Sequence, residues 1–279
     1  MKGGPEPVMI TAAVTGSITT RDDNPALPLS TTEIADSAVD CWRAGAAIIH
    51  LHARDPEGLP TQDADVYSEI VEKIRSRECD AVLNLSTGEA GGRATDFDAR
   101  LELLRLEPEM ATLDCGSVNF GDERILQGPF VFLRDAAERM RKSATIPEIE
   151  VFDSGMIGNA RRLIAEGLID PPSAWQIVVG LRGGAAADLG TVSYLTSRLP
   201  EGAVWSLLGI GRHQLAANVV SLAYGGHIRT GLEDNVYFRP GELAEGNQQL
   251  VERVVALARE FGRPVATPDQ VRERLNIAT

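Results

Sequence analysis

Two of the four histidines stand one residue apart, in the segment HLHARD at residues 50–55. If this segment ends a β-strand, the period of two places His50 and His52 on the same face of the strand. Two imidazoles on one face at a strand end are suited to bind a metal ion. Alternatively, His50 and His52 bind no metal and are polar side chains whose nitrogen atoms make ordinary hydrogen bonds.

A second group of ionisable residues follows a β-rich run near the end of the chain, in the segment HIRTGLEDN at residues 227–235. Glu233 could supply a third, oxygen ligand, and two histidines plus one glutamate with an open position form a catalytic zinc arrangement. Arg229 and Asp234 would then place a cation beside a carboxylate, which suits a proton-transfer pair. The alternative is a cluster of charges on a surface loop.

Further polar residues stand at the ends of other β-rich runs. The turn STGE at residues 86–89 could bind a carboxylate through its hydroxyl and backbone N–H groups, or be an ordinary turn. Thr112 and Asp114 share one face of the next run, and Glu148 and Glu150 share one face of the run after it. A carboxylate that points into a protein interior is costly unless it is paired or bound, which favours a functional role.

Two glycine-rich segments carry an arginine each, GLRGG at residues 180–184 and GIGRH at residues 209–213. Glycine-rich turns before a helix, near the last two strands of a barrel, often hold phosphate. An anionic cosubstrate could dock there. Two glycine turns with solvated arginines explain the same residues equally well.

Eight β-rich runs alternate with amphipathic runs and must position these residues. The β-rich runs are nearly continuous in apolar residues, as buried parallel strands should be. They span residues 8–15, 46–53, 81–86, 110–116, 147–152, 175–180, 204–209 and 226–230.

The intervening runs carry helix start and stop signals. The first has a capping box in which Glu33 follows Ser30 by three residues, and Gly45 ends it. The predicted helices span residues 31–44, 64–74, 96–104, 130–142, 156–166, 191–199, 215–224 and 243–261, with an extra terminal helix at 269–275.

Eight β-units, each followed by an α-unit, predict an α/β fold of the (β/α)8 TIM-barrel type. We expect one domain over residues 1–279 with a short extra C-terminal helix. In such a barrel the chemistry lies at the C-terminal ends of the strands, where the polar groups above would meet. A doubly wound sheet is the competing fold, but it often has a glycine-rich loop after its first strand. The segment GSITTRDDNP at residues 16–25 is not such a loop.

Composition narrows the class of protein. The chain has 279 residues with 27 Lys plus Arg against 40 Asp plus Glu, a formal charge of -13. This acidity disfavours nucleic acid and anionic membrane surfaces as partners. No apolar run approaches the roughly 18 residues of a membrane span, and residues 1–5 lack the apolar core of a signal peptide. The three cysteines form no CxxC pair. We therefore expect a cytoplasmic protein.

Taken together, seven motifs resemble the β-keto acid cleavage enzymes, and among them most closely the members that act on a 3-keto-5-amino acid. The likeness covers residues 9 to about 274, in the same order. The motifs are TAAVTG, HLHARD, NLSTG, PEMATLD-x-GS-x-NFGD, PE-x-E-x-FDSGM, GIGRH and GGHIRTGLEDN.

The resemblance implies a zinc-bearing TIM barrel, usually a homotetramer, that converts a β-keto acid and acetyl-CoA to acetoacetate and a new acyl-CoA. By matching positions, the metal ligands would be His50, His52 and Glu233. Asp234 would be the base, positioned by Arg229, which should lower the pKa of that carboxyl group. The residues that would line the substrate site are Ser86, Gly88, Glu89, Thr112, Asp114 and, as a further inward acid, Glu150.

Three positions depart from the amino-substrate members. Ile18 stands where those members have a glutamate that meets the substrate amine, Asp114 replaces an asparagine, and Glu89 replaces a glycine. An isoleucine side chain cannot pair with an ammonium group. We therefore expect a β-keto acid with an apolar tail or with a polar group placed elsewhere.

Two other functions fit parts of the pattern. A zinc-dependent TIM-barrel hydrolase also uses an HxH pair, but on the first strand and with further histidines near the fifth and sixth strands. Here no histidine lies between His52 and His213. A non-catalytic protein that binds a keto acid or acyl-CoA is the other alternative, and the complete set of reactive residues counts against it.

Overall fold

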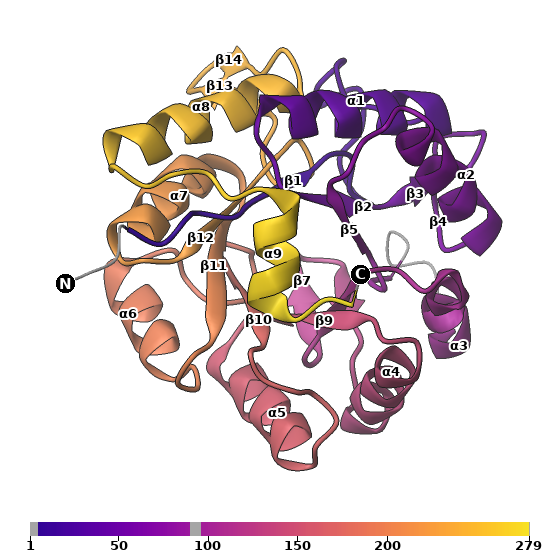
Figure 1. The fold of residues 1–279 in the computed structure, drawn as a ribbon, viewed down its shortest axis with the longest axis vertical. Helices are drawn as coiled ribbons and strands as arrows, with labels where there is room; N and C mark the ends of the chain where they lie inside the picture. Colours follow the sequence, from indigo (N-terminus) through magenta and orange to yellow (C-terminus); the bar gives the residue numbers. More distant parts are fainter. Residues whose placement is uncertain (1–4, 90–95, 279) are drawn as a thin grey trace.

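The computed structural model describes residues 5–89 and 96–278, and their eight-stranded parallel barrel confirms the predicted fold class. The strands close in the order β1-β12-β11-β10-β9-β6-β5-β2 (Figure 1). They are β1 (Ile10–Ala13), β2 (Ile48–Leu51), β5 (Val82–Leu85), β6 (Met110–Asp114), β9 (Ile146–Val151), β10 (Ala174–Val179), β11 (Val204–Gly209) and β12 (His227–Thr230). Each lies within or next to one of the eight predicted runs.

All of the described helices except the last surround the barrel, as Figure 1 shows. They are α1 (Thr31–Ala44), α2 (Ala64–Arg75), α3 (Phe97–Leu101), α4 (Phe130–Lys142), α5 (Ser154–Ala165), α6 (Leu189–Ser197), α7 (Gln214–Ala223), α8 (Asn247–Glu260) and α9 (Pro268–Leu275). The predicted capping box begins α1, where Ser30 Oγ accepts from the Glu33 N–H at 3.2 Å and the Glu33 carboxylate accepts from the Ser30 N–H at 2.9 Å. No described helix is long and apolar enough to cross a membrane.

The described part of the chain also contains three short antiparallel hairpins that were not predicted. They are β3 (Ala53–Arg54) with β4 (Pro60–Thr61), β7 (Val118–Phe120) with β8 (Arg124–Leu126), and β13 (Tyr237–Arg239) with β14 (Glu242–Leu243). Each hairpin follows the C-terminal end of a barrel strand. The predicted start of the last long helix at residue 243 was wrong, because Leu243 pairs with Tyr237 across the third hairpin and α8 begins only at Asn247.

The other end of the barrel is closed by the terminal helix. Val271 and Leu275 of α9 belong to one buried apolar cluster with Ile48, Val82 and Met110, which begin β2, β5 and β6. In Figure 1, α9 lies across the centre of the barrel. With the N-terminal ends of the strands covered, a ligand must enter at the C-terminal ends, where the polar residues are expected.

Candidate active site

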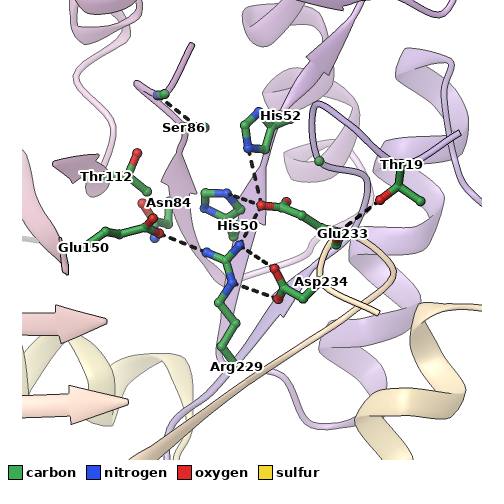
Figure 2. A network of polar contacts seen from close by, with 12 residues as sticks. Thr19, His50, His52, Asn84, Ser86, Thr112, Glu150, Arg229, Glu233 and Asp234 are labelled. Atoms are coloured by element: carbon green, nitrogen blue, oxygen red, sulfur yellow. Dashed lines mark hydrogen bonds and ion pairs between the residues drawn. The ribbon is translucent and has the colours of Figure 1, made fainter. Parts of the chain in front are cut away.

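The two histidines and Glu233 meet at the C-terminal mouth of the barrel. His50 lies in β2 and His52 directly after it, both are buried, and their rings are 5.1 Å apart. Their Nε2 atoms lie 3.4 and 3.5 Å from the same oxygen, Glu233 Oε1 (Figure 2). The strand period therefore places both imidazoles as expected.

Glu233 reaches these histidines because β12 is the barrel neighbour of β1, which in turn pairs with β2. After β12 the chain turns at Gly231, which has a φ of 143° and where a Cβ would lie 2.0 Å from the carbonyl oxygen of Ala13 in β1. A Cβ on Gly16 would lie 2.5 Å from Glu233 Cγ, and Gly16 has a φ of 69°. Glycine at position 16 thus leaves the room that the Glu233 side chain occupies.

Several polar residues that the sequence analysis did not single out fix this loop. Asn247 Oδ1 accepts from the Leu232 N–H at 2.8 Å, while its Nδ2 donates to the Val14 carbonyl at 2.8 Å. Buried Arg54 donates to the carbonyl of Gly16 at 2.9 Å. Arg54 belongs to the HLHARD motif, so its position beside the histidine pair was the available signal.

Arg229 is the centre of the charge network. It projects from β12, is buried, and donates to three carboxylates (Figure 2). It meets Asp234 through two bonds, at 3.0 and 3.1 Å, Glu233 Oε1 at 2.6 Å and Glu150 Oε1 at 3.1 Å. These three acids raise the pKa of Arg229 well above its usual value despite burial, which opposes the charged form. A permanently charged guanidinium thus holds the three carboxylates in place.

The prediction that Arg229 holds the pKa of Asp234 below its usual value was wrong. Burial raises the pKa of Asp234, and although Arg229 lowers it as predicted, the net pKa is above the usual value. Burial likewise raises the pKa of Glu150 well above normal, against the opposing effect of Arg229. A carboxyl group with a raised pKa is a stronger base when ionised, which suits proton abstraction.

The donor set at the barrel mouth fits a divalent cation. One nitrogen from each histidine and one oxygen of Glu233 lie within 4.8 Å of one another. Burial lowers the pKa of His50, which favours the neutral imidazole that metals bind. Glu233 Oε2 is buried and has no hydrogen-bond partner among the described residues. Burial opposes ionisation of Glu233, yet the two histidines and Arg229 bring its pKa well below normal.

The predicted substrate residues line the same cavity. Its volume is about 1500 Å³, and His50, His52, Arg229, Glu233 and Asp234 also line it. The predicted substrate residues in its lining are Ser86, Gly88, Glu89, Thr112, Asp114 and Glu150. All eleven residues to which the resemblance assigned a role therefore line one cavity.

Hydrogen bonds shape the turn after β5. Thr112 Oγ1 accepts from the Thr87 N–H at 3.0 Å, and Ser86 Oγ accepts from the Gly88 N–H at 3.2 Å. A Cβ on Gly88 would lie 3.2 Å from Ser86 Oγ and 3.5 Å from Asp114 Oδ2. The missing side chain therefore leaves space beside a hydroxyl and a carboxylate.

Buried Arg100, which was not predicted, lies behind the two unusual acids. Its guanidinium lies 3.5 Å from Asp114 and 4.4 Å from the centre of the Phe132 ring. Glu89 Oε1 accepts from the Gln127 N–H at 3.1 Å, and burial raises the pKa of Glu89. Two carboxyl groups thus line this side of the cavity, and the Arg100 guanidinium lies behind them, outside the lining.

The remaining histidines are not part of this cavity. His227 is buried where β12 begins, and its Nδ1 accepts from the Met9 N–H at 3.1 Å. His213 packs against Gly180, where a Cβ would lie 2.8 Å from its ring. The additional histidine ligands of the alternative zinc hydrolase are therefore not found in the described lining.

Comparisons with known proteins concern the whole chain. The sequence matches the family described as beta-keto acid cleavage enzyme over residues 7–277. It is 42% identical to the 3-keto-5-aminohexanoate cleavage enzyme of Fusobacterium nucleatum, covering 98% of both chains. It is 38% identical to the 3-oxoadipate:acetyl-CoA acetyltransferase of Cupriavidus necator, covering 98% of this chain and 95% of that protein.

Among solved structures, that of ObcA has a TM-score of 0.79 at 23% identity. The alignment covers 91% of this chain and 66% of ObcA, so it supports the barrel fold alone. The family assignment comes from the match of nearly the whole chain and from the relatives at about 40% identity. On this evidence, the chain belongs to the beta-keto acid cleavage enzyme family.

Proposed function

We propose that this protein is a zinc-dependent acyltransferase that condenses a β-keto acid with acetyl-CoA and cleaves the product to acetoacetate and a new acyl-CoA. One observation carries the proposal. The His50–His52–Glu233 group and the Asp234–Arg229 pair line the same cavity, so a metal ligand set and a base can act on one substrate. The names of the relatives, which include keto acid and acetyl-CoA transferases, support the same reaction class.

His50, His52 and Glu233 would hold the metal. Two imidazoles and one carboxylate are a common zinc donor set, although other divalent ions compete for such ligands. When bound, the ion supplies Lewis acidity that polarises the substrate ketone and makes the neighbouring CH₂ group more acidic.

Asp234 then removes a proton from the carbon between the ketone and the carboxylate, and Arg229 keeps its carboxyl oxygens oriented through two hydrogen bonds. In this proposal, Ser86 Oγ of the turn after β5 donates to the substrate carboxylate, and Gly88, which has no side chain, leaves room for that carboxylate beside Ser86. Thr112 acts on that turn, because it accepts a hydrogen bond from the Thr87 N–H. Arg229 also holds Glu150, so that this inward acid does not stand unpaired.

The two halves of the reaction balance as follows. The substrate carbanion attacks the thioester carbonyl of acetyl-CoA, a carbon–carbon bond forms, and CoA thiolate leaves. The thiolate attacks the original ketone carbon, and the bond between that carbon and the former CH₂ carbon breaks. The released carbanion takes its proton back from Asp234 and becomes acetoacetate, while the acyl group leaves as the new thioester.

The tail of the keto acid is apolar or carries its polar group away from residue 18. Ile18 lines the cavity and is 44% exposed, so it offers contact area and no charge to an amine at that position. Glu89 and Asp114 line another part of the cavity, where a donor on the tail could meet them. Comparing kcat/KM for a 3-oxoalkanoate and its 5-amino analogue tests this, and a strong preference for the amine would contradict it.

A screen of β-keto acids with acetyl-CoA tests the function as a whole. Mass spectrometry should detect both acetoacetate and the thioester of the remaining acyl group. A zinc hydrolase would yield free acid and no new thioester, and a binding protein would yield neither product. Either result across a broad panel of keto acids, with metal shown to be present, would contradict the proposal.

A homotetramer in the cytoplasm completes the proposal. The exposed apolar side chains of Leu189 and Tyr194 on α6 and of Leu215 on α7 support contacts between copies. The three cysteines are free and buried, which suits a reducing compartment. Light scattering on a size-exclusion column measures the assembly, and fractionation of the source cells measures the location.

A further inference from the structure

Arg253 is a half-buried cation with unsatisfied donors. It lies on α8, and its Nη1 donates to the Phe238 carbonyl. Its Nε and Nη2 atoms are buried and have no hydrogen-bond partner among the described residues. Burial lowers the pKa of Arg253, and no described acid offsets that effect. Because an unpaired buried charge is costly, an anion that draws this guanidinium into the adjoining cavity would stabilise it.

A second arginine lies against the same aromatic ring. The guanidinium carbons of Arg253 and Arg239 lie 5.0 and 5.1 Å from the centre of the Phe238 ring. The nearest acid to Arg239 is Glu242, 3.9 Å away and exposed, so this pair is weak and leaves the guanidinium open to a ligand. The hairpin of β13 and β14 and helix α8 thus bring two little-compensated cations together.

This pair belongs to the active-site cavity. Phe238, Arg239 and Arg253 line the same 1500 Å³ space as Glu233 and Asp234. The whole chain carries a formal charge of -13, so a polyanion is attracted only where local cations outweigh the overall field. A long ligand could therefore place its reacting group near Glu233 and Asp234 and its phosphate groups near the two arginines.

We propose that Arg253 and Arg239 bind the phosphate groups of acetyl-CoA. This rests on the proposed function, which requires that thioester. Acetyl-CoA has its phosphates and its reactive carbonyl at opposite ends of a long flexible arm, so the cavity receives the thioester near Asp234 and the phosphates near α8. Guanidinium groups suit this role because their forked donors match phosphate oxygens.

Steady-state kinetics of Arg253→Met test the assignment. The KM for acetyl-CoA should rise roughly tenfold or more, because charge-assisted hydrogen bonds to phosphate are lost. The KM for the keto acid should stay within about twofold. The thioester of N-acetylcysteamine has the same reacting group and no phosphate, so its KM should change far less than that of acetyl-CoA. Equal changes for the two thioesters would overturn the proposal.

Two further variants keep the test decisive. Arg253 also holds the hairpin through Phe238, so Arg239→Gln is measured as well, because it removes a cation without removing that bond. Arg259→Met is the matched control, since Arg259 lies exposed on the same helix and is absent from the cavity lining. If Arg212→Gln, just before α7, raises the KM for acetyl-CoA and the Arg253 and Arg239 variants do not, the phosphates bind near Arg212 and the proposal is wrong.

Calorimetry separates this site from the catalytic proposal. Adenosine 3′,5′-bisphosphate should bind the wild-type protein, and its affinity for Arg253→Met should be at least roughly tenfold lower. Adenosine, which has no phosphate, should bind the wild-type protein much more weakly than the bisphosphate does. If the protein makes no new thioester but binds the bisphosphate through Arg253, the proposed function fails and the site stands. If turnover of acetyl-CoA is normal and Arg253→Met binds the bisphosphate as tightly as wild type, the site fails alone.

Discussion

Asp234→Asn separates the proposed base from the proposed metal ligands. Asn keeps the size of the side chain but cannot take up a proton, so general-base catalysis is lost. Such catalysis contributes about 10²- to 10⁴-fold, and we expect kcat to fall by that factor. Metal content should remain at the wild-type level, because Glu233, and not Asp234, lies within 4.8 Å of both histidine nitrogens.

The cost in stability follows from the contacts of Arg229. The Asp234 carboxylate accepts two hydrogen bonds from that guanidinium, and an asparagine has one oxygen with which to accept. Losing one charge-assisted bond lowers the free energy of unfolding by about 1.5–3 kcal/mol. Arg229 keeps Glu233 and Glu150 as counterions, so the buried guanidinium is not left uncompensated and the barrel should still fold.

Three assays are made on the same sample. Mass spectrometry measures turnover, elemental analysis measures metal content, and a thermal melt measures stability. Glu233→Gln is the contrasting variant, since it should lose metal as well as turnover. Turnover of Asp234→Asn within tenfold of wild type would show that another group is the base. Loss of metal from Asp234→Asn with retention in Glu233→Gln would mean that the two carboxylates have the opposite roles.

Four other variants, one of them a control, test different parts of the structure. Gly16→Ala would bring a Cβ 2.5 Å from Glu233 Cγ, so metal content should fall. Gly167→Ala, at an almost equal φ of 70° but with open space around it, should cost only backbone strain of about 1–2 kcal/mol and keep its metal. His50→Ala should lower metal content by elemental analysis, and an unchanged stoichiometry would remove it from the ligand set. Burial lowers the pKa of His227 from 6.5 to about 4, so the unfolded chain binds the extra proton first and stability is lost as pH falls from about 6.5 to 4. The loss is about 3 kcal/mol, and urea unfolding of His227→Gln should show a shallower decline over this window; an equal decline would contradict the assignment.

Local pattern was enough to predict the barrel and the shared location of the site. Apolar runs of strand length alternating with capped helices predict eight βα units, and parallel strands bring their C-terminal ends to one mouth. The period of two sets His50 and His52 on one face whatever the rest of the chain does. Short hairpins escaped prediction because strands of two or three residues leave no periodic signal, which is why Leu243 was assigned to a helix.

The distances within the site depend on tertiary structure. Glu233 meets His50 only because barrel closure pairs β12 with β1 and β1 with β2, and because Gly16 has no side chain. The net pKa of Asp234 follows from the balance of burial against Arg229, and burial is not a property of local sequence. Hydrogen bonds between near neighbours form helices, and the run of apolar residues marks strands, so both leave a local signal. Contacts between residues nearly two hundred positions apart arise only when the whole sheet closes, so the sequence determined which side chains share the mouth and the closed barrel decided which of them touch.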